Sequence, residues 1–214
     1  MNKKNITSFC CSALILSGAI FSHQSMANEA DQLKQKLANV ASLHSTFKQT
    51  VIDVNNKVIQ QGEGTFALAT PSKLYWHLTQ PDESLIVTKG DNVWIYNPFA
   101  EEVTVMNLEQ AIASSPMTLL IHRDDKTWSN YDVTKHGHCF DIKPKAMDVN
   151  VSKVESCFDN DQLSKFVIHD AQGNTSTFDL SNQRTLKANE SSLFDFTPPK
   201  SVDIDDQRET KIQH

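Results

Sequence analysis

Short segments in which apolar and polar residues alternate follow one another along most of the chain, and this period of two constrains the fold most. Before residue 107 the segments are 47–51, 62–69, 73–79, 85–87, 93–97 and 101–106. Turn-forming sequences such as QPDE at 80–83 and KGDN at 89–92 separate them. Short strands at even spacing with turns between them predict a mainly β protein, built as an antiparallel sheet, sandwich or barrel.

The alternation resumes after residue 127. The later segments are 128–133, 138–143, 149–158, 163–169, 175–180 and 192–196. The polar, proline-marked end of the chain, 196–214, predicts a loop and tail.

Two regions depart from the strand pattern and predict helices. Residues 28–45 place Leu33, Leu37, Val40, Ala41 and His44 at helical spacing, with Asn28 as the N-cap. Residues 107–123 show no period of two, and Pro116 divides them into two short helices. A helical insertion between strands typically covers an open face of the sheet.

The first 27 residues have the features of a secretory signal peptide. Lys3 and Lys4 precede a short apolar run at 9–21, and Ser25-Met26-Ala27 supplies small residues for cleavage. We expect cleavage after Ala27 and a single mature domain at 28–214, exported and soluble because no lipid-anchor cysteine follows the apolar run. No other apolar run approaches the ~18 residues of a membrane-spanning helix.

The charge of the chain argues against nucleic acid and anionic membrane surfaces as partners. The whole chain has a formal net charge of −6, and removal of Lys3 and Lys4 makes the mature part more acidic. No basic cluster follows the signal segment.

Cys139 and Cys157 remain after Cys10 and Cys11 leave with the signal peptide, and an even count in an exported protein suggests a structural disulfide. A hairpin that turns near 147–150 would place the two cysteines opposite each other. The other face of this hairpin would then carry Phe140, Ile142, Val154 and Ser156. The alternative is two unpaired thiols.

No known catalytic motif is present: the chain lacks G-x-S-x-G, H-E-x-x-H, P-loop and Rossmann patterns. His136 and His138 in "KHGHC", followed by Cys139, are the best metal candidates, but the sequence assigns no further ligand to complete a zinc site. The alternative is a polar strand end. The acidic residues of "QPDES" (80–84) and "DDQR" (205–208) indicate a turn and a solvated surface rather than an acid–base pair.

Large apolar side chains are so frequent that they could form either an ordinary hydrophobic core or the lining of a ligand cavity. Twelve of them could point to one side of the sheet: Phe66, Leu68, Leu74, Trp76, Leu78, Trp94, Tyr96, Phe99, Phe140, Phe166, Phe194 and Phe196. The pattern alone does not separate a core from an aromatic-lined cavity for a large apolar ligand.

Several stretches closely resemble one family. YWHLTQPDESLIVTKGDNVWIYNPF (75–99) and FTPPKSVDIDDQR (196–208), with FKQT (47–50) and GEGTFAL (62–68), resemble the outer-membrane lipoprotein carrier proteins of the Lol system. The resemblance covers essentially the whole mature chain. It implies an incomplete antiparallel β-barrel with a short-helix lid over a hydrophobic cavity.

The resemblance also implies a function. Carriers of this family are monomeric periplasmic chaperones of Gram-negative bacteria, and they use no cofactor and are not enzymes. They accept acylated lipoproteins from an inner-membrane ABC transporter and shield the acyl chains. They then deliver the lipoproteins to a receptor on the outer membrane.

On this resemblance we expect the acyl chains to contact two groups of side chains. Barrel residues would be Phe47, Phe66, Leu68, Leu74, Trp76, Leu78, Trp94, Tyr96 and Phe140. Lid residues would be Met117, Leu119 and Leu120, with Pro116 at the lid hinge. Pro98 and Phe99 would turn the chain at the rim.

One position departs from the family pattern. Members commonly carry an arginine before the proline that corresponds to Pro71, and that arginine is thought to hold the lid closed; here the residue is Thr70. The threonine hydroxyl donates fewer hydrogen bonds than a guanidinium, and its shorter side chain does not reach as far. We therefore expect Thr70 to gate the lid, and we expect the lid to be held closed differently from that of other family members. Lys73 is a candidate to take the role of the arginine.

Three other functions remain open at this point. The first is the outer-membrane receptor of the same pathway, which shares the fold but should carry a lipid anchor. The second is a periplasmic metal-dependent hydrolase that uses His136 and His138. The third is a lipid-sensing regulatory module on the same barrel.

Overall fold

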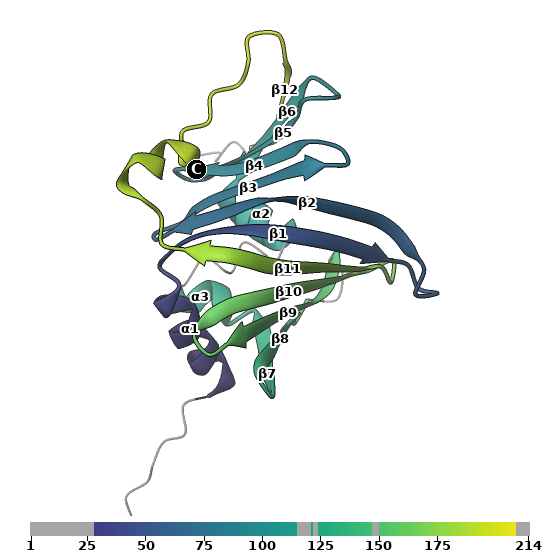
Figure 1. Cartoon of the computed structure of the whole chain (residues 1–214), viewed down its shortest axis with the longest axis vertical. Helices are drawn as coiled ribbons and strands as arrows, with labels where there is room; N and C mark the ends of the chain where they lie inside the picture. Colours follow the sequence, from purple (N-terminus) through teal and green to yellow (C-terminus); the bar gives the residue numbers. More distant parts are fainter. Residues whose placement is uncertain (1–27, 115–120, 122–123, 147–149, 209–214) are drawn as a thin grey trace, which may run out of the picture.

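The computed structural model describes residues 28–114, 121, 124–146 and 150–208. Twelve strands form one sheet in the order β12-β6-β5-β4-β3-β2-β1-β11-β10-β9-β8-β7 (Figure 1). β12 and β7 lie at the two ends of this order and are not joined to each other, so the barrel is open. The prediction of a mainly β, incomplete antiparallel barrel is confirmed.

The strands follow the alternating segments of the sequence. They are β1 (Ser42–Ile52), β2 (Val58–Ala69), β3 (Lys73–Gln80), β4 (Ser84–Lys89), β5 (Asn92–Asn97), β6 (Glu102–Asn107), β7 (Tyr131–His136), β8 (Cys139–Pro144), β9 (Val151–Asp159), β10 (Gln162–Asp170), β11 (Thr175–Arg184) and β12 (Asp203–Asp206). All neighbouring pairs are antiparallel except β12 and β6, which run parallel.

The first helix is shorter than predicted. α1 (Glu29–Asn39) begins after the N-cap Asn28, whose side chain accepts a hydrogen bond from the backbone N–H of Asp31. It buries Leu33 and Leu37 as expected but ends before Val40. β1 starts at Ser42, where pairing with Ala69 of β2 begins, so His44 lies in a strand and not on the helix. The backbone hydrogen bonds between β1 and β2 stabilise the strand at 42–45 more than the weak helical pattern of these residues favours a helix.

The insertion after β6 contains α2 (Leu108–Ser114), which agrees with the predicted helix before Pro116. The predicted helix after Pro116 falls mostly at 117–120 and 122–123, outside the described residues. α3 (Asp125–Trp128) follows, capped by Asp124. Trp128 was predicted to open a strand, but it ends this helix and is buried, because the capped turn at Asp124 continues through it.

The C-terminal region corrects two predictions. The segment expected as a strand at 192–196 lies largely in a 3-10 helix, η2 (Ala188–Phe194). The segment expected as loop and tail contains β12, which pairs with β6 at the sheet edge. The backbone N–H groups of Asp203 and Gln207 donate to the carbonyls of Glu101 and Val105, so the open edge of β6 recruits a polar segment with no strand pattern.

The core lies against one face of the sheet, which we call the inner face. Leu33 and Leu37 of α1, Leu108 and Ala111 of α2 and Trp128 of α3 belong to the same buried cluster as the inner-face side chains. In Figure 1, α2 lies behind the sheet, so the viewer sees the opposite, outer face.

Gly64 permits a close approach at the β2–β3 corner. A Cβ atom at Gly64 would lie 2.0 Å from the carbonyl oxygen of His77 and 2.6 Å from the Phe47 ring, and a Cβ at Gly62 would lie 2.6 Å from the carbonyl oxygen of Gln80. The pairing of β2 and β3 also shifts between Glu63 and Gly64. Because Gly62 and Gly64 have no side chains, the strands can approach closely and the sheet can bend here, as is usual for glycines at barrel corners.

Candidate functional site

A row of aromatic rings crosses the inner face. The Phe47 and Trp76 rings stack with centroids 4.2 Å apart, and Phe178 packs edge-on against Trp76 at 4.9 Å. Phe66 contacts Trp76 at 5.4 Å and Phe166 at 5.8 Å. The rings come from β1, β2, β3, β10 and β11, so they form one continuous apolar surface.

Most of the predicted barrel residues lie on this inner face. Phe47, Phe66, Leu68, Leu74, Trp76 and Phe140 are buried in the cluster, and Leu78 is partly buried against it. The structure thus brings these seven side chains together. Their contact with a ligand stays a prediction.

Trp94 and Tyr96 were predicted to line the same face, and this was wrong. Trp76 pairs with Ile86 of β4, and Ile86 pairs with Ile95 of β5. Because directly paired residues share a face, Ile95 belongs to the inner face and its neighbours Trp94 and Tyr96 to the outer face. β5 is apolar on both faces, so its own sequence pattern did not indicate which residues face inward.

The C-terminal segment covers Trp94 and Tyr96. The Phe196 ring lies 6.1 Å from Trp94 and 5.9 Å from Tyr96, measured between centroids. Phe194 is buried, and the amine of Lys73 lies 5.7 Å from its ring centroid. Phe194 and Phe196 therefore anchor this segment on the outer face. The sequence had allowed them to share a face with the inner-face row, but they do not join it.

A bidentate ion pair holds the start of this segment. Arg184 donates to both carboxylate oxygens of Glu190 at 2.6 and 2.7 Å, and the backbone N–H of Lys187 donates to Glu190 at 2.8 Å. The Arg184 hydrogen bonds, assisted by the Lys187 N–H, lower the pKa of Glu190 to about 2.

Phe99 protrudes from the β5–β6 turn with 92% of its surface exposed. The side chain of Asn97 accepts hydrogen bonds from the backbone N–H groups of Phe99 and Ala100. The predicted turn is therefore present, but Phe99 does not join the apolar cluster, because the turn directs it into solvent.

The predicted gating residues divide between described and undescribed parts. Thr70 is exposed, and both its backbone N–H and its hydroxyl donate to the carbonyl of Ala41, at 2.9 and 3.3 Å. Lys73, the suggested substitute for the missing arginine, faces Phe194 on the outer face. Pro116, Met117, Leu119 and Leu120 lie outside the described residues.

Several residues of the inner face escaped the sequence prediction. Phe178 contacts both Phe47 and Trp76, and Ile86, Ile95 and Met106 are partly buried against the cluster. The alternation Ser176, Phe178, Leu180 carried the signal for Phe178. Ile86 and Ile95 could not be separated from their apolar neighbours without the register.

Cys139 and Cys157 face each other on β8 and β9 and form a disulfide with an S–S distance of 2.09 Å. Phe140 pairs with Ser156 and Ile142 with Val154 on the other face, which is the predicted hairpin arrangement. The Cys139 sulfur is therefore not a thiolate ligand for the "KHGHC" candidate. No three His, Cys, Asp or Glu residues in the described part of the chain come together as a metal-binding group.

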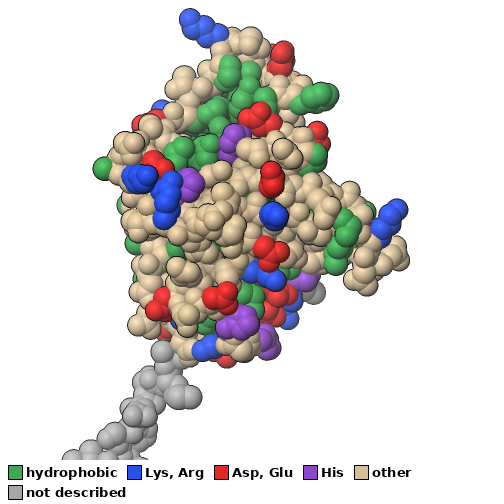
Figure 2. Space-filling model, viewed as in Figure 1, with side chains coloured by type: hydrophobic (Ala, Val, Ile, Leu, Met, Phe, Trp, Pro, Cys, Tyr) green, Lys and Arg blue, Asp and Glu red, His purple; other side chains and the backbone are tan. Residues whose placement is uncertain are grey.

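The outer face of β8–β10 is polar and internally paired. Glu155 contacts Lys153 at 2.5 Å and His169 at 2.9 Å, and Lys153 also lies 3.6 Å from Asp141. Burial acts to raise the pKa of Glu155, but hydrogen bonds from Lys153 and His169 outweigh it and the pKa is lowered. Figure 2, seen from this side, shows scattered charges here and hydrophobic side chains gathered higher, toward β3–β6.

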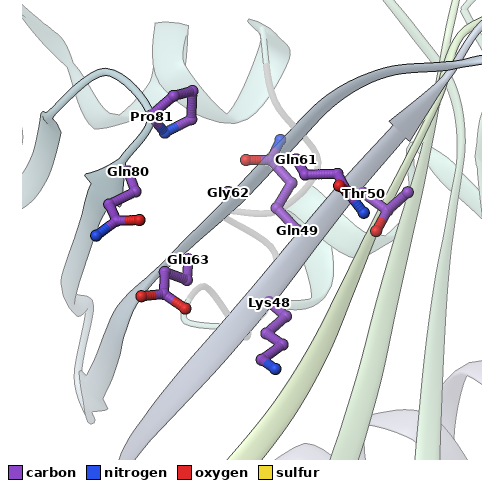
Figure 3. Close-up of a pocket in the computed structure, with 8 residues that line it drawn as sticks. All are labelled: Lys48, Gln49, Thr50, Gln61, Gly62, Glu63, Gln80 and Pro81. Atoms are coloured by element: carbon purple, nitrogen blue, oxygen red, sulfur yellow. The ribbon is translucent and has the colours of Figure 1, made fainter.

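A polar notch of about 320 Å³ lies where β3 ends beside β1 and β2. Its lining consists of Lys48, Gln49, Thr50, Gln61, Gly62, Glu63, Gln80 and Pro81. Figure 3 shows Gln80 and Pro81 on one side and Gln49, Gln61 and Thr50 on the other. A lining of amides and charges does not suit an acyl chain, so this notch is not the predicted hydrophobic cavity.

Comparison with known proteins places these features in one family. The family model described as "Outer membrane lipoprotein carrier protein LolA" matches residues 38–197. The outer-membrane lipoprotein carrier protein of Shewanella baltica (strain OS155) is 54% identical over 198 residues, which cover 92% of this chain and 95% of that protein. The protein of the same name from Shewanella pealeana is 57% identical over 194 residues, covering 90% and 93%.

A solved structure shares the fold. An uncharacterized conserved protein from Thermus thermophilus superposes with a TM-score of 0.51 at 10% identity, covering 84% of this chain and all of that one. Within the described residues, no helix combines the length and apolar character needed to cross a bilayer.

Proposed function

The chain belongs to the family of outer-membrane lipoprotein carrier proteins, and we propose that it carries acylated lipoproteins through the periplasm as a chaperone. The inner face supports this proposal most directly. It offers a continuous row of aromatic and aliphatic side chains that short helices cover instead of a second sheet.

The ligands would be the acyl chains of lipoproteins. We assign their contacts to Phe47, Phe66, Leu68, Leu74, Trp76, Leu78 and Phe140 on the sheet and to Met117, Leu119 and Leu120 on the lid. The sheet residues lie in or against one buried cluster. A ligand that takes the place of the covering helices would keep this surface away from water.

The energetics explain why a carrier is needed. Burial of one methylene group is worth roughly 0.8 kcal/mol, so one long acyl chain is worth roughly 10 kcal/mol. A free lipoprotein therefore leaves a membrane very slowly. A carrier whose helices and ligand compete for the same surface takes up the chain and still releases it, because each state buries the inner face.

The partners follow from this role. An inner-membrane ABC transporter would hand lipoproteins to the carrier, and an outer-membrane receptor would receive them. Residues 1–27 would direct export as a signal peptide; they lie outside the described residues. The carrier would act as a monomer and perform no covalent chemistry, so its cycle consists of binding and release.

Lipoprotein release from membranes tests the proposal. Mature protein beginning at Asn28 is added to spheroplasts, and the supernatant is analysed for an acylated lipoprotein in a stoichiometric soluble complex. The complex is the expected result. If folded protein leaves every lipoprotein on the membrane, the carrier function does not hold, and lipid sensing or an enzymatic role on the same barrel becomes the better hypothesis.

A further inference from the structure

Ser156 lies in the middle of β9, on the inner face. It pairs directly with Phe140 of β8 and Phe166 of β10, and all three residues are buried. Within the described residues, the Ser156 hydroxyl is the one buried side-chain polar group that makes no hydrogen bond. A desolvated hydroxyl without a partner destabilises a folded protein, so each such group calls for a physical explanation.

Two other buried hydroxyls show how this fold normally satisfies such groups. Ser45, which pairs with Phe66, donates to the carbonyl of Ser181 at 2.7 Å. Thr88 donates to the carbonyl of Ser72 at 2.7 Å and accepts from the backbone N–H of Leu74 at 2.6 Å. Ser156 therefore differs from both, although Ser45 is equally buried and has the same kind of aromatic neighbour.

We propose that the Ser156 hydroxyl is a subsite that donates a hydrogen bond to the carbonyl oxygen of a bound acyl ester or acyl amide. This inference rests on the proposed carrier function. Ser156 is paired with two phenylalanines, and no group among the described residues accepts a hydrogen bond from its hydroxyl. A hydrocarbon chain supplies no acceptor either. The linkage that joins an acyl chain to its head group does carry a carbonyl oxygen, which is a good acceptor.

The subsite becomes available when the ligand takes the place of the helices. Leu33, Leu37 and Trp128 belong to the same cluster as Phe140 and Phe166 and cover this face in the empty protein. Displacement of these side chains by an acyl group would exchange one apolar cover for another. The ligand would add the acceptor that the helices do not provide.

The test compares a long-chain monoacylglycerol with its ether-linked analogue, which has the same chain but no carbonyl. Mature Ser156→Ala protein should bind the ester about two- to tenfold more weakly than the unsubstituted protein. Its affinity for the ether should not change. Its melting temperature without ligand should stay the same or rise, because the substitution removes an unpaired hydroxyl.

Ser45→Ala is the matched control. It should lower the melting temperature, because it removes a satisfied hydroxyl, and leave the ratio of ester to ether affinity unchanged. An ester labelled at its carbonyl carbon gives a second readout. Its infrared stretch should shift to lower frequency in the unsubstituted protein and return in Ser156→Ala.

Two outcomes contradict the inference in different ways. If Ser156→Ala lowers the melting temperature and leaves the ratio of ester to ether affinity unchanged, a buried water is the partner of the hydroxyl, and the subsite does not exist. If the unsubstituted protein binds neither lipid but still releases lipoproteins from spheroplasts, the carrier function stands and the subsite is wrong. If it also releases no lipoprotein, the carrier function is wrong, and the subsite is wrong with it.

Discussion

Gly64 shows at the scale of one residue how this sheet bends. The His77 carbonyl and the Phe47 ring occupy the space that any side chain at this position would need. The ring of Phe47 reaches across the glycine to stack on Trp76. The absence of a side chain at Gly64 thus leaves room both for the close approach of β2 and β3 and for the stack of Phe47 on Trp76.

Replacement of Gly64 by alanine should therefore destabilise the protein. We expect a loss of about 3 kcal/mol, because the clash involves backbone and a packed ring, neither of which can move freely. Gly90→Ala is the control: its Cβ would meet no atom within 4 Å, and only its positive φ of 61° opposes the change. That variant should lose about 1 kcal/mol. Chemical denaturation measures both, and equal losses would contradict the packing argument.

Trp76 and Trp94 form a natural pair for testing which face binds acyl chains. Trp76 lies in the inner-face row, whereas Trp94 packs against Phe196 on the outer face. Trp76→Leu should lower the free energy of unfolding by about 2 kcal/mol. It should also reduce lipoprotein release from spheroplasts several-fold, when equal amounts of folded protein are compared. Trp94→Leu should release nearly as much as the unsubstituted protein. Similar losses in both variants would show that release does not depend on the inner face.

At the scale of elements, the β8–β9 hairpin is closed by the disulfide between Cys139 and Cys157, which are separated by 18 positions in the sequence. Closing a loop of this length restricts the unfolded chain by about 3 kcal/mol. The double substitution Cys139→Ala/Cys157→Ala should lower the free energy of unfolding by about that amount. A reducing agent should destabilise the original protein but not the double variant, and thermal unfolding with and without reductant checks both.

The C-terminal segment should loosen in acid because Glu190 titrates. Its pKa is 4.5 ordinarily and about 2 in the folded protein. The Arg184–Glu190 pair therefore stabilises the fold fully above about pH 4.5, and this contribution is lost as the pH falls toward 2. The protection of the amides at 185–195, taken relative to their intrinsic exchange rates at each pH, should fall across that window.

Glu190→Gln provides the comparison for this titration. The variant should show faster exchange at 185–195 already at neutral pH, and it should lack the Glu190 part of the acid response. Exchange in β1 and β2 serves as an internal reference for global unfolding. An acid response at 185–195 that is identical in both proteins would show that Glu190 does not hold this segment.

At the scale of the whole molecule, the open sheet leaves its inner face to be covered by either helices or ligand. α2 buries Leu108 and Ala111 in the inner-face cluster, follows β6 directly, and contacts the sheet mainly at β5 and β6. Ligand binding should therefore displace helices and leave the strand ladders intact. A triacylated lipopeptide should speed amide exchange in α2 and should not speed it in β1 or β2. Faster exchange in the central strands would instead indicate that the sheet itself opens.

Much of this architecture follows from local pattern. The period of two located most strands before residue 184, because each strand must place alternate side chains on one buried face. Asn28, Leu33 and Leu37 located the first helix, and the spacing of Cys139 and Cys157 within an alternating hairpin indicated how they and their neighbours face each other. These features depend on residues close in sequence, so the sequence alone was sufficient.

The face of β5 and the path of the C-terminus depended on the tertiary structure. Trp94 and Ile95 are both apolar neighbours, and only the register through Ile86 to Trp76 decides which of them faces inward. β12 is polar and exposed, and it becomes a strand because β6 offers an unpaired edge. The sequence determined where strands form and which residues could be buried. Register and edge pairing join residues far apart in the chain, so only the folded sheet decided which apolar face meets the helices.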